Sequence, residues 1–288
     1  MNRKLLWGLT AFLLLTASAC QNPAKPSDTA MQPAAGNSNG ASDNVNSNPA
    51  QPIQTVKPTD ASPQPQPTAA PAETPKKYRL NPKSYDILPI DPSVTEKKMV
   101  LLSFDDGPKD KEMLDSMLNT LDKHHAKAIF FVNGYRVKQK PELLKLVHER
   151  GQTIGNHSWD HIDLKKESQE KVNQQISDVQ AIVKDVIGEA PRFFRPPFGS
   201  GGDLVKAKVK EENMLFMTWS NGSKDWEMST KSNNPDQVVA NVLEQLRPGS
   251  NILMHELPWT DKALDKLLTE LEQKQYGFID PSTIEITP

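Results

Sequence analysis

Two histidines four positions apart, His157 and His161, follow a short apolar run in this chain. On a helical turn, side chains at this spacing share one face, so both imidazoles can bind the same metal ion. A nearby carboxylate would complete a site with open positions for water, the arrangement of catalytic metal sites. Nitrogen and oxygen ligands suit Zn2+, Co2+, Ni2+, Fe2+ or Mn2+, and Zn2+ is our first choice. Solvent-exposed surface histidines are the alternative interpretation.

A pair of adjacent carboxylates, Asp105 and Asp106, can supply the oxygen ligand. They lie in the sequence SFDDGP at residues 103–108, directly after the apolar run Met99–Leu102. Such a run, closed by Gly-Pro, is typical of a buried strand that stops abruptly. Two neighbouring anions are costly unless a cation shares their site, so the pair favours a metal-binding or catalytic role. A turn or a helix cap is the alternative for Asp-Asp-Gly on its own.

Apolar runs with the length of strands alternate with amphipathic segments of helical periodicity. The predicted strands are Met99–Phe104, Ala128–Val132, Gln152–Ile154, Phe193–Phe194, Met214–Trp219, Ile252–Met254 and Gly277–Ile279. The predicted helices are Glu112–Lys123, Pro141–Arg150, Ser168–Ile187, Leu204–Glu212, Pro235–Leu246 and Asp261–Gln275. This alternation predicts an α/β fold with a parallel sheet and helices outside it. An open doubly wound sheet and a closed barrel both agree with the pattern.

The residues that could do chemistry follow the predicted strands one after another. After successive strands come the segments 105–106, 155–161, 195–199 and 221–226, and then His255. The carboxyl ends of parallel strands meet at one end of a barrel or an open sheet, where such folds place their sites. We therefore expect these residues to share one site.

Five short sequences in this order resemble the signature of a known family. They are SFDDG at 103–107, HSWDH at 157–161, RPPFG at 195–199, DW at 225–226 and LMH at 253–255. Together they resemble the polysaccharide deacetylases that carry a NodB homology domain, carbohydrate esterase family 4. The resemblance extends over roughly residues 97–280 and implies a distorted (β/α) barrel, NodB-like, with about seven parallel strands.

The resemblance implies a metal site and a general base. Asp106, His157 and His161 correspond to the ligands of a divalent metal, which agrees with the residue types. Asp105 corresponds to the general base that takes a proton from the attacking water. Arg195 corresponds to the partner that keeps Asp105 charged and oriented, and Pro196-Pro197 stiffen the loop behind it.

The resemblance also implies a general acid and a substrate pocket. His255 corresponds to the general acid that protonates the leaving amine, and Asp225 to the carboxylate that tunes it. A carboxylate beside an imidazole favours the protonated form that an acid needs. Trp226 and Leu253 correspond to the walls of a pocket for the acetyl methyl group. The backbone N–H of Phe198 corresponds to a donor to the oxyanion.

The implied activity is metal-dependent hydrolysis of N-acetyl groups on amino sugars of a cell-wall or extracellular polysaccharide, with release of acetate. The substrates would be peptidoglycan N-acetylglucosamine or N-acetylmuramic acid, or chitin-like oligomers. An esterase for O-acetylated xylan or wall polymer, and a non-catalytic wall-binding lipoprotein, are the alternatives. Gly222 stands where the family often has Asp, and Phe198 where it often has Tyr. We expect these departures to alter loop geometry but not to abolish activity, since neither removes a ligand, base or acid.

The first 20 residues resemble a bacterial lipoprotein signal peptide. Arg3 and Lys4 precede an apolar stretch, Leu5–Leu15, that is too short to span a bilayer. Cys20 follows small residues, although Ala17 stands where a large aliphatic residue is preferred. We expect Cys20 to be lipidated, which would hold the protein on the outer side of the cell membrane, facing the wall. An ordinary cleaved signal peptide is the alternative.

The remaining chain divides into a tether, residues 21–77, and a deacetylase domain, residues 78–288. Eleven of the chain's 24 prolines lie in the first segment, which has too few large apolar residues to form a core, so we expect it to be disordered. Cys20 is the only cysteine, which excludes an internal disulfide. The net charge of −2 gives no indication of nucleic-acid binding. An acetylated glycan and the membrane are the expected partners of a monomer.

Overall fold

The computed structural model describes residues 74–286. The predicted signal peptide, Cys20 and nearly all of the predicted tether lie outside this range. The described end of the predicted tether contacts the domain, since Lys76 Nζ donates to the Ser282 carbonyl at 2.7 Å and the Lys77 N–H to the Thr283 carbonyl at 2.8 Å. Within residues 74–286, none of the helices is both long enough and apolar enough to cross a membrane.

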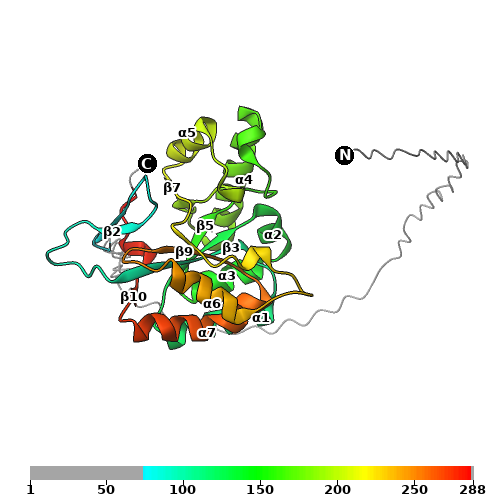
Figure 1. The fold of residues 1–288 in the computed structure, drawn as a ribbon. Helices are drawn as coiled ribbons and strands as arrows, with labels where there is room; N and C mark the ends of the chain where they lie inside the picture. Colours follow the sequence, from blue (N-terminus) through cyan, green and yellow to red (C-terminus); the bar gives the residue numbers. More distant parts are fainter. Residues whose placement is uncertain (1–73, 287–288) are drawn as a thin grey trace, which may run out of the picture. The chain divides into compact units, whose positions relative to one another are not determined.

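A parallel sheet forms the centre of the domain (Figure 1). Its strands are β3 (Met99–Gly107), β4 (Ala128–Val132), β5 (Thr153–Asn156), β6 (Phe193–Phe194), β7 (Leu215–Phe216), β8 (Asn221–Gly222), β9 (Asn251–His255) and β10 (Gly277–Phe278). Seven of them follow the spatial order β7-β6-β5-β4-β3-β9-β8, and β10 pairs with the first residues of β3. This curled sheet confirms the predicted distorted (β/α) barrel.

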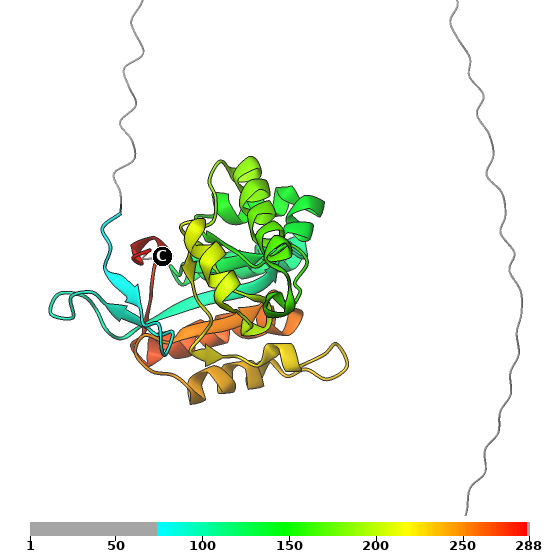
Figure 2. The same ribbon diagram turned by 90° about the horizontal axis from the view of Figure 1, so that it is seen from above.

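Seven α-helices cover the sheet in the described part of the chain (Figure 2). They are α1 (Lys111–Lys123), α2 (Gly134–Gln139), α3 (Pro141–Glu149), α4 (Gln169–Ile187), α5 (Asp203–Glu211), α6 (Pro235–Glu244) and α7 (Pro258–Gln273). Helices α6, α7, α1, α3, α4 and α5 contact one another in that order and so form a continuous outer layer. Helix α4 is the longest. Ser168 caps its start, where the side chain accepts from the Lys171 N–H, and Gly188, with a φ of 86°, caps its end.

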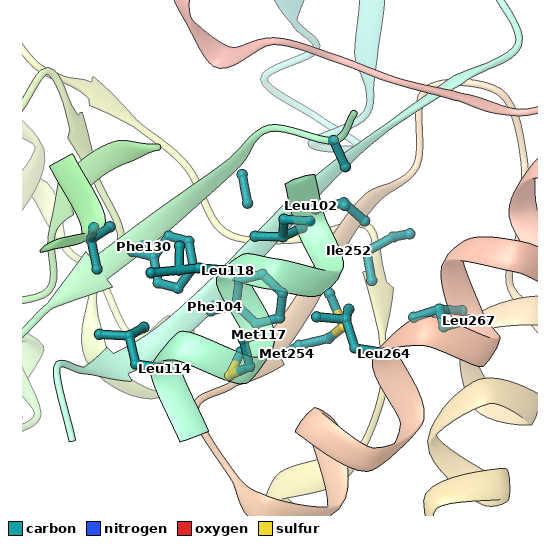
Figure 3. Packing of buried hydrophobic residues seen from close by; sticks show 14 of the residues in the cluster. Leu102, Phe104, Leu114, Met117, Leu118, Phe130, Ile252, Met254, Leu264 and Leu267 are labelled. Carbon is teal, nitrogen blue, oxygen red and sulfur yellow. The ribbon is translucent and has the colours of Figure 1, made fainter. Parts of the chain in front are cut away.

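The main core lies between the sheet and helices α1 and α7 (Figure 3). Its side chains alternate with the pleat of β3, so that Leu102 and Phe104 face the helices. Phe104 stacks on Phe130 of β4 with ring centroids 5.0 Å apart. Full burial of each such side chain contributes about 1.5–3 kcal/mol, which fixes β3 at the centre of the sheet.

The structure contains elements that the sequence pattern did not predict. Strands β1 (Tyr78–Leu80) and β2 (Ile87–Pro89) form a short antiparallel hairpin at the start of the domain, in which Tyr78 is buried. Helix α2 and the two-residue strand β8 were also not predicted, because each is too short for a periodic pattern. Strand β3 extends to Gly107, three residues beyond its predicted end, and therefore carries both Asp105 and Asp106.

Candidate active site

The carboxyl ends of the strands surround a cavity of about 630 Å³. Eight of the ten site residues predicted within the domain line it, namely Asp105, Asp106, His157, His161, Phe198, Trp226, Leu253 and His255. The other two, Arg195 and Asp225, are fully buried directly behind the cavity wall. The sequence-based expectation that these residues converge is therefore met by the fold.

Asp106, His157 and His161 form a cluster at one side of the cavity. Asp106 Oδ1 lies 3.5 Å from His157 Nε2 and 3.3 Å from His161 Nε2, and one potential ligand atom from each residue falls within 4.8 Å of the others. The predicted helical turn is wrong, because residues 157–161 form a loop. Positive φ angles at Ser158 (64°) and His161 (55°) fold this loop so that both rings face Asp106.

Several features of this cluster fit a divalent metal. The His157 Nδ1 lies 2.7 Å from the Arg195 carbonyl, which must accept a hydrogen bond and so leaves Nε2 free as a ligand. Burial lowers the pKa of His157 and favours the neutral form, which binds metals. Asp106 Oδ1 is buried without a hydrogen-bond partner among the described residues, a cost that a cation would remove.

The charge state of Asp106 also suits a ligand. Burial alone would raise the pKa of this carboxyl, but interactions with the neighbouring imidazoles and with the Lys109 ammonium outweigh it and lower the pKa. Lys109 Nζ lies 3.8 Å from Asp106 Oδ2. Asp106 itself has a φ of 67°, a conformation that turns its side chain into the cavity at the end of β3.

Asp105 is held by Arg195 in a buried ion pair. Arg195 Nη1 donates to Asp105 Oδ1 at 2.7 Å, and to the Ser103 hydroxyl at 2.9 Å. Asp105 is only 3% exposed and Arg195 is fully buried. Because Oδ1 is occupied by the guanidinium, Oδ2 remains available at the cavity and can accept a proton there.

The guanidinium of Arg195 is fixed by more than its partner carboxylate. Its Nη2 donates to the Thr218 carbonyl at 3.0 Å, and its Cζ lies 4.3 Å from the centroid of the Phe131 ring. Arg195 therefore fills a slot across the sheet between β6 and the segment after β7. A planar, multiply bonded cation in this slot holds the charge and direction of Asp105.

His255, at the end of β9 beside β3, is held by Asp225. The His255 Nδ1 lies 2.8 Å from Asp225 Oδ1, and the His255 backbone N–H donates to Asp225 Oδ2 at 2.7 Å. Burial alone would lower the pKa of His255, but the hydrogen bond and charge of Asp225 outweigh it and raise the pKa. The ring is thus poised as an acid, with Nε2 free for a proton donation.

Two residues that support Asp225 were not found from the sequence. The Thr260 hydroxyl donates to Asp225 Oδ2 at 2.6 Å, and the Trp259 Nε1–H donates to the Asp225 carbonyl at 2.9 Å. Both lie at the start of α7. In the sequence, only their positions, with Trp259 four and Thr260 five residues after His255, suggest that they lie near the site. Thr260 thus adds a hydrogen bond to the fully buried carboxylate, and Trp259 fixes the backbone that carries it.

A further buried carboxylate, Glu256, lies behind the strand end that carries the acidic pair. Its Oε2 accepts from the Lys109 N–H at 2.9 Å, while its Oε1 has no partner among the described residues. A Cβ on Gly107 would fall 1.7 Å from Oε1, so only glycine fits there. Burial raises the pKa of Glu256 to about 7.

The cavity wall is largely aromatic and apolar. Phe198 is 66% exposed and Trp226 is 41% exposed, whereas Leu253 is buried in the floor. Trp219, the last residue of the predicted strand Met214–Trp219, also lines the cavity. Phe198 has a φ of 59° within the short turn Pro197–Gly199, which directs its ring onto His161 at a centroid distance of 4.8 Å.

Comparisons with known proteins agree with this arrangement. A family model described as polysaccharide deacetylase matches residues 93–217. A peptidoglycan-N-acetylglucosamine deacetylase of Bacillus cereus is 33% identical over 190 residues, which cover 64% of this chain and 69% of that protein. The chain belongs to the polysaccharide deacetylase family.

Two further relatives match a similar share of this chain but differ in how much of their own length is matched. The peptidoglycan-N-acetylglucosamine deacetylase PgdA of Listeria monocytogenes is 38% identical over 190 residues. The chain spans about two fifths of that relative's length, since the match covers 39% of it. The solved structure of peptidoglycan deacetylase PdaC from Bacillus subtilis superposes with a TM-score of 0.59 at 31% identity, covering 65% of this chain and 89% of that one.

One similar structure is a family member without activity. A CE4 family pseudoenzyme from Bacillus anthracis is 31% identical and has a TM-score of 0.60, covering 64% of this chain and 63% of that one. Membership of the polysaccharide deacetylase family therefore does not by itself establish turnover. Activity in this family depends on the side chains that line the cavity.

Proposed function

We propose that this protein is a metal-dependent N-deacetylase that removes acetyl groups from amino sugars of a cell-wall polysaccharide, with peptidoglycan as the first candidate. The observation that carries the proposal is the presence of a supported base and a supported acid, Asp105 with Arg195 and His255 with Asp225, on one cavity. Names of relatives that refer to peptidoglycan N-acetylglucosamine and N-acetylmuramic acid support the choice of polymer.

The metal would be held by Asp106, His157 and His161, with Zn2+ as the first choice. A divalent cation in such a site lowers the pKa of water and polarises the acyl oxygen. Its ligand set of one carboxylate and two imidazoles suits several first-row metals, so the native metal is part of the proposal.

The residues around the metal site divide the proton transfers between them. Asp105 Oδ2 accepts a proton from the water that attacks the acetyl carbonyl carbon. The C–N bond then breaks, and His255 Nε2 donates a proton to the leaving amine, so that acetate and a free amino sugar result. General base and general acid steps each contribute typically about 10²–10⁴-fold to the rate.

The test is acetate release by the purified full chain. N-acetylglucosamine oligomers, intact peptidoglycan and an O-acetylated xylan are each incubated with protein that has been stripped of metal and then reloaded. We expect release from the N-acetylated substrates that depends on added metal. Faster release from the O-acetylated xylan would favour an esterase, and no release from any acetylated glycan would favour a wall-binding role.

We also propose that the protein is exported and lipid-anchored through Cys20, as a monomer that faces the wall. The support is the resemblance of residues 1–20 to a lipoprotein signal peptide. Replacement of Cys20 by Ser should move the protein from the membrane fraction to the culture medium. Retention of the variant in the membrane fraction would argue against the lipid anchor.

A further inference from the structure

One wall of the cavity contains a tryptophan for which the proposed reaction has no role. Trp219 lies in the segment between β7 and β8, next to Trp226 in the lining of the cavity. It is half-buried, whereas Trp226 and Phe198 are more exposed. Large apolar rings that face a solvent-filled cavity are more often found where a ligand covers them.

Gly199 makes room for the Trp219 indole, and Gly222 lies on its other side. A Cβ on Gly199 would lie 3.0 Å from Trp219 Cη2 and 3.1 Å from Cζ3, which is tighter than ordinary van der Waals contact. A Cβ on Gly222 would lie 3.6 Å from Trp219 Nε1. The indole thus occupies a slot between the turn after β6 and strand β8, and both sides of the slot are bare backbone.

Gly222 sets the position of the second indole as well. A Cβ there would lie 3.0 Å from Trp226 Cη2, so a side chain would push the ring away. With glycine in place, the Trp219 and Trp226 rings lie 6.2 Å apart at an interplanar angle of 57°. Trp226 continues to His255, with ring centroids 5.7 Å apart. The aromatic wall therefore begins at the proposed acid and extends away from it.

The size of the cavity indicates that more than an acetyl group enters it. Its volume of about 630 Å³ is in the range of about 300–1,000 Å³ that is typical of pockets for small ligands. An acetyl methyl needs only the corner between Trp226 and Leu253. Trp219 and the rest of Trp226 line the same cavity and are available to contact a sugar ring.

We infer that Trp219 and Trp226 form a subsite for the sugar ring next to the acetylated residue. A pyranose ring has an apolar face of C–H groups and a polar rim of hydroxyls, which matches the face of an indole. Gly199 and Gly222 are positioning residues for this subsite. The inference rests on the proposed function for the identity of the polymer, and it makes Trp219 a determinant of selectivity for glycans over small acetyl compounds.

The test separates binding from turnover. Isothermal titration with an N-acetylglucosamine tetramer is performed on the metal-loaded full chain carrying Asp105→Asn, with Trp219 either intact or replaced by Leu. Because aromatic contacts are worth about 0.5–1.5 kcal/mol beyond area burial, we expect Trp219→Leu to raise the Kd about tenfold. Tyr276→Leu, a half-buried aromatic residue at the opposite end of β3, is the matched control and should leave the Kd unchanged.

A kinetic comparison completes the test in the otherwise unmodified protein. Trp219→Leu should raise the KM for the tetramer by a much larger factor than the KM for 4-nitrophenyl acetate, a split that general unfolding would not produce. Equal tetramer binding with and without Trp219, or no binding by the parent protein, would overturn the subsite. Binding that depends on Trp219 without acetate release by the wild type would instead refute the proposed reaction and leave the subsite standing.

A second measurement does not depend on the folding of the leucine variant. The Asp105→Asn protein is labelled with 5-fluorotryptophan, and its 19F spectrum is recorded as the tetramer is added. Resonances of tryptophans in the cavity wall should shift on binding. A spectrum in which no tryptophan resonance moves at saturating tetramer would also overturn the subsite.

Discussion

Asp225 contacts His255 twice, through Oδ1 to the ring nitrogen Nδ1 at 2.8 Å and through Oδ2 to the backbone N–H at 2.7 Å. One buried carboxylate therefore fixes the rotation of the ring, its tautomer and its charge. The ring hydrogen bond leaves Nε2 as the only nitrogen that can donate to a substrate. The base, Asp105, pairs with His255 in register on the neighbouring strand β3 but has a different partner, Arg195.

Replacement of Asp225 by Asn should move the alkaline limb of the activity profile. The hydrogen bond and charge of Asp225 raise the pKa of His255, so their loss lets the ring lose its proton at a lower pH. We expect the alkaline limb of kcat/KM against pH to shift to lower pH and the maximum to fall about 10²-fold or more. An unchanged alkaline limb would show that His255 is not the acid.

Neighbouring substitutions should separate the base from the metal ligand. Asp105→Asn should lower kcat by about 10²–10⁴-fold while metal content stays near that of the wild type, because Asp105 supplies a proton acceptor. Asp106→Asn should lose metal, because it removes the anionic ligand of the cluster. Activity assays are paired with metal analysis of the dialysed proteins. Loss of metal in Asp105→Asn would contradict the division of roles.

The buried pair Arg195–Asp105 should be strongly coupled in stability. Arg195→Met leaves an uncompensated buried carboxylate and should cost about 3–5 kcal/mol, as for other broken buried pairs. In the double variant with Asp105→Asn, the cost should be smaller than the sum of the single costs by about 1–3 kcal/mol. Urea denaturation of the full chain, with metal removed from all variants, measures each term.

The exposed pair Lys266–Asp236, with Nζ and Oδ1 2.8 Å apart, provides a matched control for that cycle. Both side chains are more than half exposed, so water screens their charges and the coupling between Lys266→Met and Asp236→Asn should be at most about 1 kcal/mol. A buried coupling no larger than the exposed one would mean that Arg195 orients Asp105 without stabilising the fold.

Much of this site could be predicted because its residues follow strands in a fixed order. The apolar run before Asp105 predicts a strand, and the ends of parallel strands converge whatever the loops do. The loop at His157 to His161 shows the limit of such reasoning. Its left-handed turns at Ser158 and His161 fall on residues that are neither Gly nor Asn, so the sequence predicts a helical turn where a loop brings both rings to Asp106.

Tertiary contacts also gave roles to residues that local patterns could not identify. The sequence predicts Trp219 at the end of an apolar strand, and only the bare backbone of Gly199, distant in sequence, leaves space for its ring in the cavity wall. Glu256 is a charged residue after the last motif, for which exposure is the ordinary expectation. It is 1% exposed because the missing side chain of Gly107, distant in sequence, leaves space for it.

The burial of Glu256 makes the stability of the metal-free protein depend on pH. Its pKa is raised from 4.5 to about 7 in the folded state, so folding favours the protonated carboxyl. The stabilising contribution of that proton is fully present below about pH 4.5 and is lost as pH rises through about 7. The difference between these pKa values corresponds to about 3 kcal/mol in the free energy of unfolding.

Glu256→Gln should remove this dependence, because the amide keeps an acceptor for the Lys109 N–H and stays neutral at every pH. Relative to the wild type, the variant should gain about 3 kcal/mol between about pH 4.5 and pH 7 and little beyond that range. Urea denaturation in the presence of a chelator at several pH values measures the gain, and Glu149→Gln, which removes an exposed carboxylate, is the control. A Glu256→Gln curve parallel to that of the wild type across this range would mean that the buried carboxylate stays charged, with Lys109 as its counterion.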